Sequence, residues 1–111
     1  MKNDIIYLKH ILEEIAKVGS SLNKISKTNF KNNVDLQDAN IRRLEVIGEA
    51  TKNISLKLKN SYPDVEWKLI AGTRDILIHA YFSVDLDLVW GIIKNDLPKF
   101  KKMIEKILKN N

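Results

Sequence analysis

One stretch decides how this sequence is interpreted: Leu69-Ile70-Ala71-Gly72-Thr73-Arg74-Asp75-Ile76-Leu77-Ile78-His79-Ala80-Tyr81-Phe82. Its apolar residues are dense enough for a core element. It nevertheless holds one of the three arginines and one of the two histidines of the chain. Such side chains rarely enter a buried element unless they are paired or used. We therefore interpret residues 74–81 as the functional site and the rest as its scaffold.

Working outward, apolar residues recur at steps of three and four along most of the chain, which is typical of amphipathic helices. We expect a helix from residue 4 to about 27 and a polar connection at 29–33. A second helix should run from about 35 to 59, with Asp35 as its N-cap. Small residues on this helix leave room for another helix to approach closely: Ala39, Gly48 and Ala50.

The sequence of the second half of the chain predicts two more helical stretches. The first covers residues 65–81, with Gly72-Thr73 as a candidate break. The last begins at a cap on Ser83 or Asp85 and reaches about residue 109. Pro98 should kink or restart it, with Asp96 as the new N-cap. Because β-type alternation is absent, the sequence predicts one all-α domain over residues 1–111, an antiparallel up-and-down bundle of four to five helices.

Composition narrows the class of protein. The chain has 111 residues and no cysteine, which excludes disulfides and thiolate metal sites. Its apolar runs are too short for a transmembrane helix or a signal peptide, so we expect a cytoplasmic protein without a membrane partner. The net charge is +5, and residues 94–111 contribute +4 of it through six lysines. This lysine-rich end suits a polyanion such as RNA, although a solvated helix face is the favoured interpretation.

Helix geometry relates the polar residues of the central stretch. Asp75 and His79 are four apart and share a face, where the carboxylate can orient the imidazole and raise its basicity. Arg74 and His79 are five apart and point about 140° from each other on a straight helix. They can meet at one phosphate if the helix ends or distorts near His79, if the arginine wraps round, or if two copies of the chain pack together. We favour the homodimer.

The residue types indicate phosphodiester chemistry that needs no metal or other cofactor. A guanidinium binds phosphate oxygens in a fork and stabilises developing negative charge. Histidine can take the proton of a ribose 2′-OH and return one to the leaving 5′-oxygen. The spacing of Arg74 and His79 is common by chance, so from the residues alone the favoured interpretation is that they merely tie helices together.

Two further features of the sequence have both a functional and a structural interpretation. Glu45 and Glu49 are spaced i, i+4 and could form a carboxylate pair near the site, although ordinary ion pairing on a helix surface is the favoured interpretation. His10 has no second ligand at metal-binding spacing, so we expect it to be structural or exposed.

The motif and its flanks resemble a known family. Residues 74–81 match R-x4-H-x-Y, the signature of HepT-like proteins (the former DUF86 group) of the HEPN superfamily. The flanking matches are Arg42-Arg43-Leu44-Glu45-Val46-Ile47-Gly48-Glu49-Ala50, Trp67-Lys68-Leu69-Ile70-Ala71-Gly72-Thr73, Val89-Trp90-Gly91-Ile92-Ile93 and Asp96-Leu97-Pro98. The resemblance covers essentially the whole chain.

The resemblance implies a helical-bundle RNase toxin of a type II toxin–antitoxin system, acting as a homodimer with tRNA as its suggested substrate. Arg74 and His79 would be the catalytic residues, and the supporting role of Asp75 follows from its spacing to His79 on the helix and not from the resemblance. The implied antitoxin partner is MntA, a minimal nucleotidyltransferase that transfers AMP from ATP to the tyrosine of the motif, here Tyr81. An anionic adduct there would repel RNA phosphate.

One residue departs from the family pattern, and two other functions remain open. The family commonly has asparagine where this chain has Asp75, and an acid there lowers the attraction for phosphate and can raise the pKa of His79. The first alternative is a non-catalytic HEPN subunit that binds nucleotide or RNA beside a nucleotidyltransferase. The second is a plain interaction bundle in which Arg74 pairs with Glu45 or Glu49.

Overall fold

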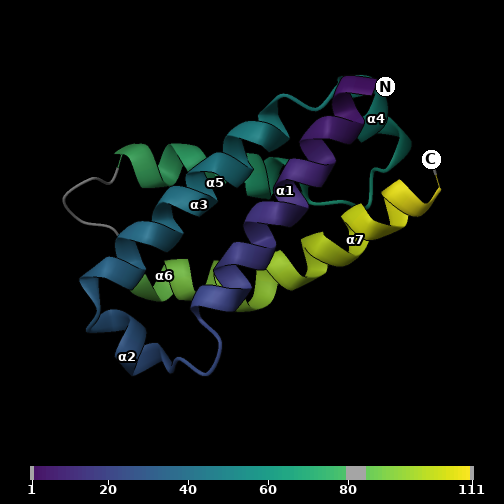
Figure 1. Ribbon diagram of the computed structural model, residues 1–111. Coiled ribbons are helices and arrows are strands. Elements are labelled where there is room, and N and C mark those ends of the chain that lie inside the picture. The colour runs from purple at the N-terminus through teal and green to yellow at the C-terminus, as the bar shows by residue number, and fades with distance from the viewer. Residues whose placement is uncertain (1, 80–84, 111) are drawn as a thin grey trace.

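The protein is all-α in the residues that its computed structural model describes, 2–79 and 85–110, with side chains described for 3–75 and 85–110. The predicted fold class is therefore confirmed. In chain order the elements are α1 (Lys2–Ser21), α2 (Lys27–Lys31), α3 (Val34–Lys52), α4 (Leu56–Ser61), α5 (Trp67–His79), α6 (Leu86–Gly91), the π-helix η1 (Ile92–Asp96) and α7 (Leu97–Lys109) (Figure 1).

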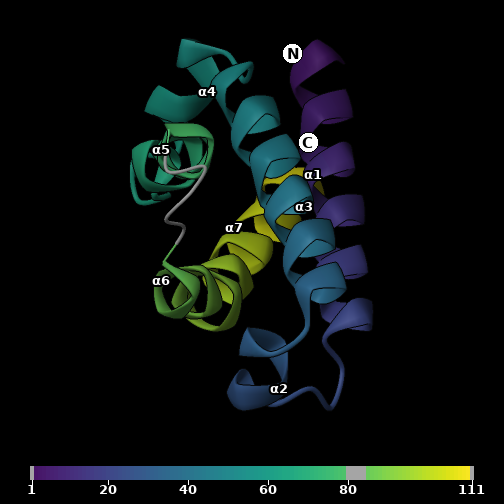
Figure 2. The same ribbon diagram turned by 90° about the vertical axis from the view of Figure 1, so that its left-hand side faces the viewer.

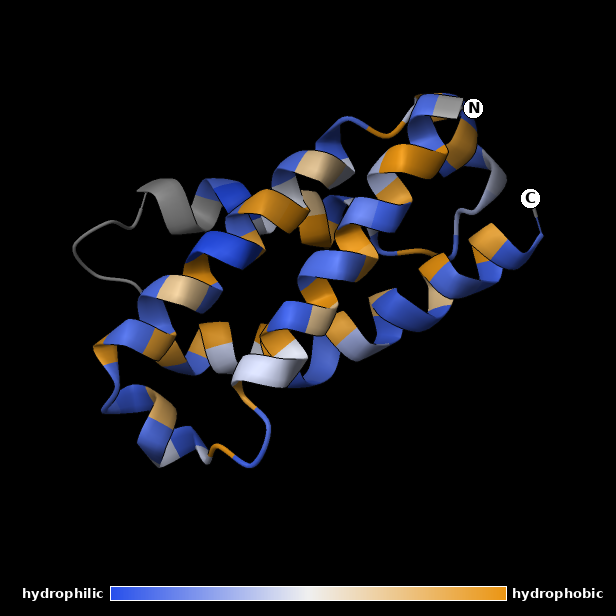
Figure 3. Cartoon of the chain, in the orientation of Figure 1, coloured by the Kyte–Doolittle hydropathy of each residue, from blue (hydrophilic) through white to orange (hydrophobic). Residues whose placement is uncertain are grey.

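Helix α3 is the central element of the bundle. It makes its most extensive contacts with α5 and with α1, which flank it (Figure 2), while α7 packs against α1. The core between these helices is mainly aliphatic, with Ile11, Leu44 and Ile104 among its fully buried residues, and it includes the aromatic rings of Trp67 and Phe100. Hydrophobic and hydrophilic residues alternate along α1 and α7 as amphipathic stripes (Figure 3). None of the described helices is long and apolar enough to span a membrane.

The first predicted helix is wrong at its C-terminal end. Helix α1 ends at Ser21, six residues early, and Lys24 then takes a left-handed conformation with φ 63°. Such a residue ends a helix because it reverses the backbone path. The side chain of Ser26 accepts a hydrogen bond from the Asn29 amide and starts the five-residue helix α2, which overlaps the predicted polar connection at residues 29–31.

The second predicted helix is two helices. Asn33, not Asp35, is the N-cap of α3, since its side chain accepts from the Leu36 amide at 3.0 Å. The helix ends at Lys52, and Ser55 then caps α4. Ser55 is itself held from α1, because its amide and hydroxyl donate to the two carboxylate oxygens of Asp4 at 2.8 and 2.6 Å.

The candidate break at Gly72-Thr73 is absent. Helix α5 is continuous, and the hydroxyl of Thr73 donates to the carbonyl of Leu69 at 3.0 Å inside the helix. At the C-terminal end Asp85 caps α6 by accepting from the amides of Asp87 and Leu88. The π-helix ends at Asp96 and α7 begins at Leu97, so a new helix does start at the predicted point. The predicted capping role of Asp96 is wrong, because its side chain makes no capping hydrogen bond.

Candidate functional site

A glycine allows α5 to lie close to α3 at the site. A Cβ added to Gly48 would lie 2.8 Å from Cβ of Arg74 and 3.3 Å from the carbonyl oxygen of Ile70. Real Cβ contacts are almost never that short. The predicted role of Gly48 in close helix approach is therefore confirmed, and the residue it makes room for is Arg74.

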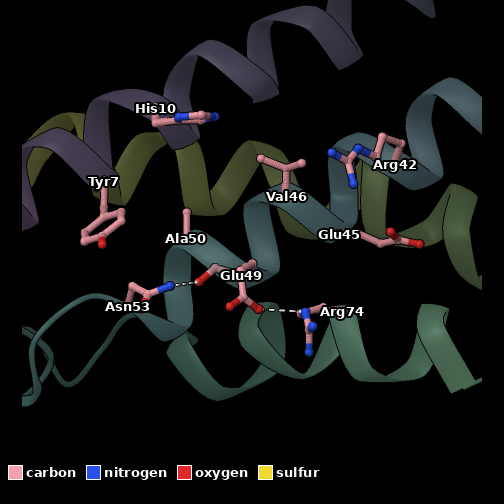
Figure 4. Close-up of a pocket in the computed structure, with 9 residues that line it drawn as sticks. All are labelled: Tyr7, His10, Arg42, Glu45, Val46, Glu49, Ala50, Asn53 and Arg74. Atoms are coloured by element: carbon pink, nitrogen blue, oxygen red, sulfur yellow. Dashed lines mark hydrogen bonds and ion pairs between the residues drawn. The ribbon is translucent and has the colours of Figure 1, made fainter.

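Two carboxylates contact the half-buried Arg74 guanidinium. Its Nε lies 2.6 Å from Oε2 of Glu49, and its NH1 lies 3.4 Å from Oδ1 of Asp75 (Figure 4 shows the Glu49 contact). A guanidinium carries five N–H donors, so engagement through Nε and one NH1 contact leaves donors for a further anion. Of the two acids considered from the sequence, Glu49 is the one that pairs with Arg74.

Asp75 is bound to α3 by a lysine that the sequence reasoning missed. Nζ of Lys52 lies 2.9 and 3.1 Å from the two carboxylate oxygens of Asp75. This lysine offsets the negative charge that Asp75 places beside the site. The pair spans 23 positions in sequence, and no local pattern connects the two residues.

The other motif residues are placed only in part. Helix α5 is described as far as His79, and residues 80–84 lie outside the described residues, so none of the three geometries that would let Arg74 and His79 act on one phosphate is tested. The His79 side chain lies outside the described residues, as does Tyr81. The predicted contact between Asp75 and His79, and the roles of His79 and Tyr81, therefore remain predictions.

A surface pocket of about 390 Å³ opens beside Arg74. Helix α1 contributes Tyr7 and His10, α3 contributes five residues from Arg42 to Ala50, Asn53 follows directly after the end of α3, and α5 contributes Arg74 (Figure 4). His10 is exposed, as expected, but it also faces this pocket.

Sequence reasoning missed this pocket. A usable signal exists on α3 and at the residue that caps its C-terminal end, where the lining residues recur at helical spacing: Arg42, Glu45, Val46, Glu49, Ala50 and Asn53. No signal in the sequence indicated that Tyr7 and His10 of α1 would face them.

Other charged groups lie away from Arg74. Asp87 of α6 binds Lys27 and Lys31 of α2, and these two hydrogen bonds lower the pKa of Asp87. The lysines of α7 are exposed, and so is Lys94 of η1, whose Nζ lies 4.7 Å from the ring centre of Trp90. Within the described residues, no three His, Cys, Asp or Glu side chains are grouped so that they could hold a metal ion.

A family model described as "Ribonuclease HepT-like" matches residues 11–107. The chain belongs to the HepT-like ribonuclease family. The family membership predicted from residues 74–81 and their flanks is therefore confirmed. No solved structure matched the chain significantly.

Several curated relatives of this HepT-like chain have ribonuclease names. Two proteins of Methanocaldococcus jannaschii with "putative RNase" in their names are 45% and 42% identical to it. The first is also named a gamma-glutamylcyclotransferase; the match covers 97% of this chain but only about half, 49%, of that relative. The second is matched over 94% of this chain and 96% of its own length. "Probable ribonuclease HepT" of Thermococcus cleftensis is 41% identical, over 93% of this chain and 94% of that protein.

Proposed function

We propose that this HepT-like protein is a metal-independent endoribonuclease that acts as the toxin of a type II toxin–antitoxin system. The observation that carries the proposal is the position of Arg74. Its guanidinium is fixed on α5 against Gly48 and Glu49 of α3, at the edge of a pocket, inside the motif of a ribonuclease family. A fixed guanidinium of this kind can hold a phosphate in one orientation.

In the proposed reaction Arg74 binds the non-bridging oxygens of the scissile phosphate. His79 takes the proton of the ribose 2′-OH, the 2′-oxygen attacks phosphorus, and the bond to the 5′-oxygen breaks. The proton then goes to that 5′-oxygen, which leaves a 2′,3′-cyclic phosphate on one product and a 5′-hydroxyl on the other. Charge that develops on the phosphate during attack is stabilised by the guanidinium.

The proposal includes a homodimer, because Arg74 and His79 diverge by about 140° on α5. In a two-fold dimer that packs this helix near its mate, Arg74 of one copy and His79 of the other can reach the same phosphate. Asp75 supports the site by orienting His79, and Lys52 limits the repulsion that Asp75 exerts on RNA.

Control of the toxin is proposed to act on Tyr81. A MntA-like nucleotidyltransferase would transfer AMP from ATP to the Tyr81 hydroxyl and release pyrophosphate. The bulky anion would then oppose RNA beside Arg74. Among RNAs, tRNA is the substrate that we propose from the family resemblance.

One observation favours a second candidate function. The Arg74 guanidinium is already engaged by Glu49 and Asp75, as expected of an interaction bundle or of a non-catalytic nucleotide-binding subunit. In both of these functions purified protein leaves RNA intact.

The two candidates are separated by expressing the wild type without a partner and following growth and RNA integrity, with Arg74→Ala as the comparison. A toxin RNase arrests growth and shortens RNA, and the variant does neither. Co-expression of a MntA-like nucleotidyltransferase should restore growth and add AMP to the wild type but not to Tyr81→Phe, as measured by mass spectrometry. Wild type that leaves growth and RNA unchanged contradicts the toxin proposal.

A further inference from the structure

The pocket beside Arg74 has the size and lining of a site for an organic ligand. Its volume of about 390 Å³ falls in the range of small-molecule sites, which is about 300–1,000 Å³. Arg74 lines it, so a ligand in the pocket is adjacent to the phosphate that Arg74 is proposed to bind. The pocket is therefore in a position to bind the organic group that is bonded to that phosphate.

The lining favours a flat, partly apolar group. Val46 and Ala50 of α3 give an apolar surface, and Ala50 is buried. Across from them, α1 presents the ring of Tyr7 and the imidazole of His10 (Figure 4). Aromatic and imidazole rings are the side chains on which nucleobases stack in single-stranded RNA sites. At the Tyr7 end, the side-chain amide of Asn53 is held by the carbonyl of Glu49 at 2.9 Å.

The charges that line the pocket favour the same kind of ligand. Arg42 and Arg74 face it together with Glu45 and Glu49, so its formal charge is balanced. A site that only gathers phosphate would carry a clear positive excess. A balanced lining with two separate arginines suits an uncharged base that has a phosphate on each side.

We propose that this pocket is a subsite for one nucleotide of the RNA, next to the scissile phosphate. The base lies between the α3 surface of Val46 and Ala50 and the rings of Tyr7 and His10, and Arg42 binds the phosphate on the far side of that nucleotide. This inference rests on the proposed ribonuclease function. A free mononucleotide has the same chemistry as a nucleotide of RNA, so the test must separate the two sources.

The kinetic arm uses purified protein and one synthetic oligoribonucleotide. His10→Ala and Arg42→Ala remove exposed side chains, so both variants should melt like the wild type. Loss of stacking or of a phosphate contact should raise KM roughly tenfold with a smaller change in kcat, and His10→Ala should also change the base preference at the cleavage site. The matched controls are Lys9→Ala, beside His10 on α1, and Lys57→Ala on α4, both exposed and outside the pocket.

The binding arm does not depend on cleavage. Amide NMR shifts are followed while AMP, GMP, CMP and UMP, or an uncleavable 2′-deoxy oligonucleotide, are added to ¹⁵N-labelled wild type. Saturable shifts around Tyr7, His10 and Asn53 with the oligonucleotide, which Arg42→Ala weakens, support the subsite. Shifts with mononucleotides alone would overturn the RNA assignment in favour of a free-nucleotide site.

The two arms keep failure of this inference distinct from failure of the proposed function. If the wild type cleaves RNA while His10→Ala and Arg42→Ala keep its KM and its cleavage pattern, the subsite is refuted and the ribonuclease stands. If the wild type does not cleave RNA, the proposed function fails, and the NMR titration alone decides whether the pocket binds a nucleotide. Absence of shifts with every probe then refutes nucleotide binding in the pocket.

Discussion

Replacing Gly48 by alanine should push α5 away from α3 and move Arg74 with it. The new Cβ would meet Cβ of Arg74 at 2.8 Å, whereas ordinary contact begins at 3.4 Å, so α5 must retreat by about 0.6 Å. Overpacking of this kind costs about 1–3 kcal/mol. Alanine recovers about 1 kcal/mol of it through its higher helix propensity, and the net loss of unfolding free energy should be roughly 0–2 kcal/mol.

Gly72→Ala is the matched control, because Gly72 lies in α5 and an added Cβ there meets nothing within 4 Å. This variant should gain about 1 kcal/mol from helix propensity alone. The two alanine variants should therefore differ by roughly 1–3 kcal/mol, which corresponds to a gap in Tm of about 4–12 °C for a domain of this size.

Thermal unfolding followed by circular dichroism measures the gap, and RNA cleavage by the same samples measures the effect on the site. A displacement of Arg74 by several tenths of an ångström should lower kcat severalfold in Gly48→Ala, because catalysis is sensitive to misplacement on this scale. Equal Tm values for the two variants, or full activity in a destabilised Gly48→Ala, would refute the idea that Gly48 sets the position of Arg74.

Two other predictions follow from contacts of α3 and α4. Burial raises the pKa of Asp4, but the two hydrogen bonds from Ser55 and the charge of Lys59 outweigh it and the pKa is lowered. The contribution of the Asp4 carboxylate to stability is thus present above the ordinary pKa of 3.8 and is lost as pH falls through the lower folded pKa. Asp4→Ala should cost about 2 kcal/mol of unfolding free energy at pH 7, and in urea unfolding its stability should fall less than that of the wild type at acid pH. An equal loss of stability at acid pH in both proteins would contradict this. Glu49→Gln removes a negative competitor for the half-buried Arg74 guanidinium, and the Glu49 carboxylate is itself exposed, so stability should change by less than about 1 kcal/mol. RNA binding should tighten in fluorescence anisotropy, and weaker binding would show that Glu49 is needed to hold Arg74.

Apolar periodicity and small residues predicted the all-α bundle and the close packing at Gly48, because both depend on one helix face at a time. The ends of the helices were harder to predict from the sequence. The separation of α3 from α4 depends on Ser55, which Asp4 holds from 51 positions away. The start of α3 was hard to predict because Asn33 and Asp35 can both cap a helix, and the structure uses Asn33.

The residues of the candidate site that lie close together in sequence were predictable, and the contacts that join different helices were not. Arg74 and Asp75 stand out in the sequence because they interrupt an apolar stretch. Lys52 reaches Asp75 only through the packing of α3 on α5. His10 enters the pocket only because α1 and α3 pack in one register, and one helix's sequence does not specify its register against another.

The most direct test of the central claim is RNA cleavage by purified wild type, Arg74→Ala and His79→Ala in EDTA, with the dimer and the fold of each sample confirmed. The proposed mechanism predicts that the wild type cleaves and leaves 2′,3′-cyclic phosphate ends, while both variants lose at least about a hundredfold in rate. Equal cleavage by all three proteins, or no cleavage by the wild type, would contradict the assignment of Arg74 and His79 as catalytic residues.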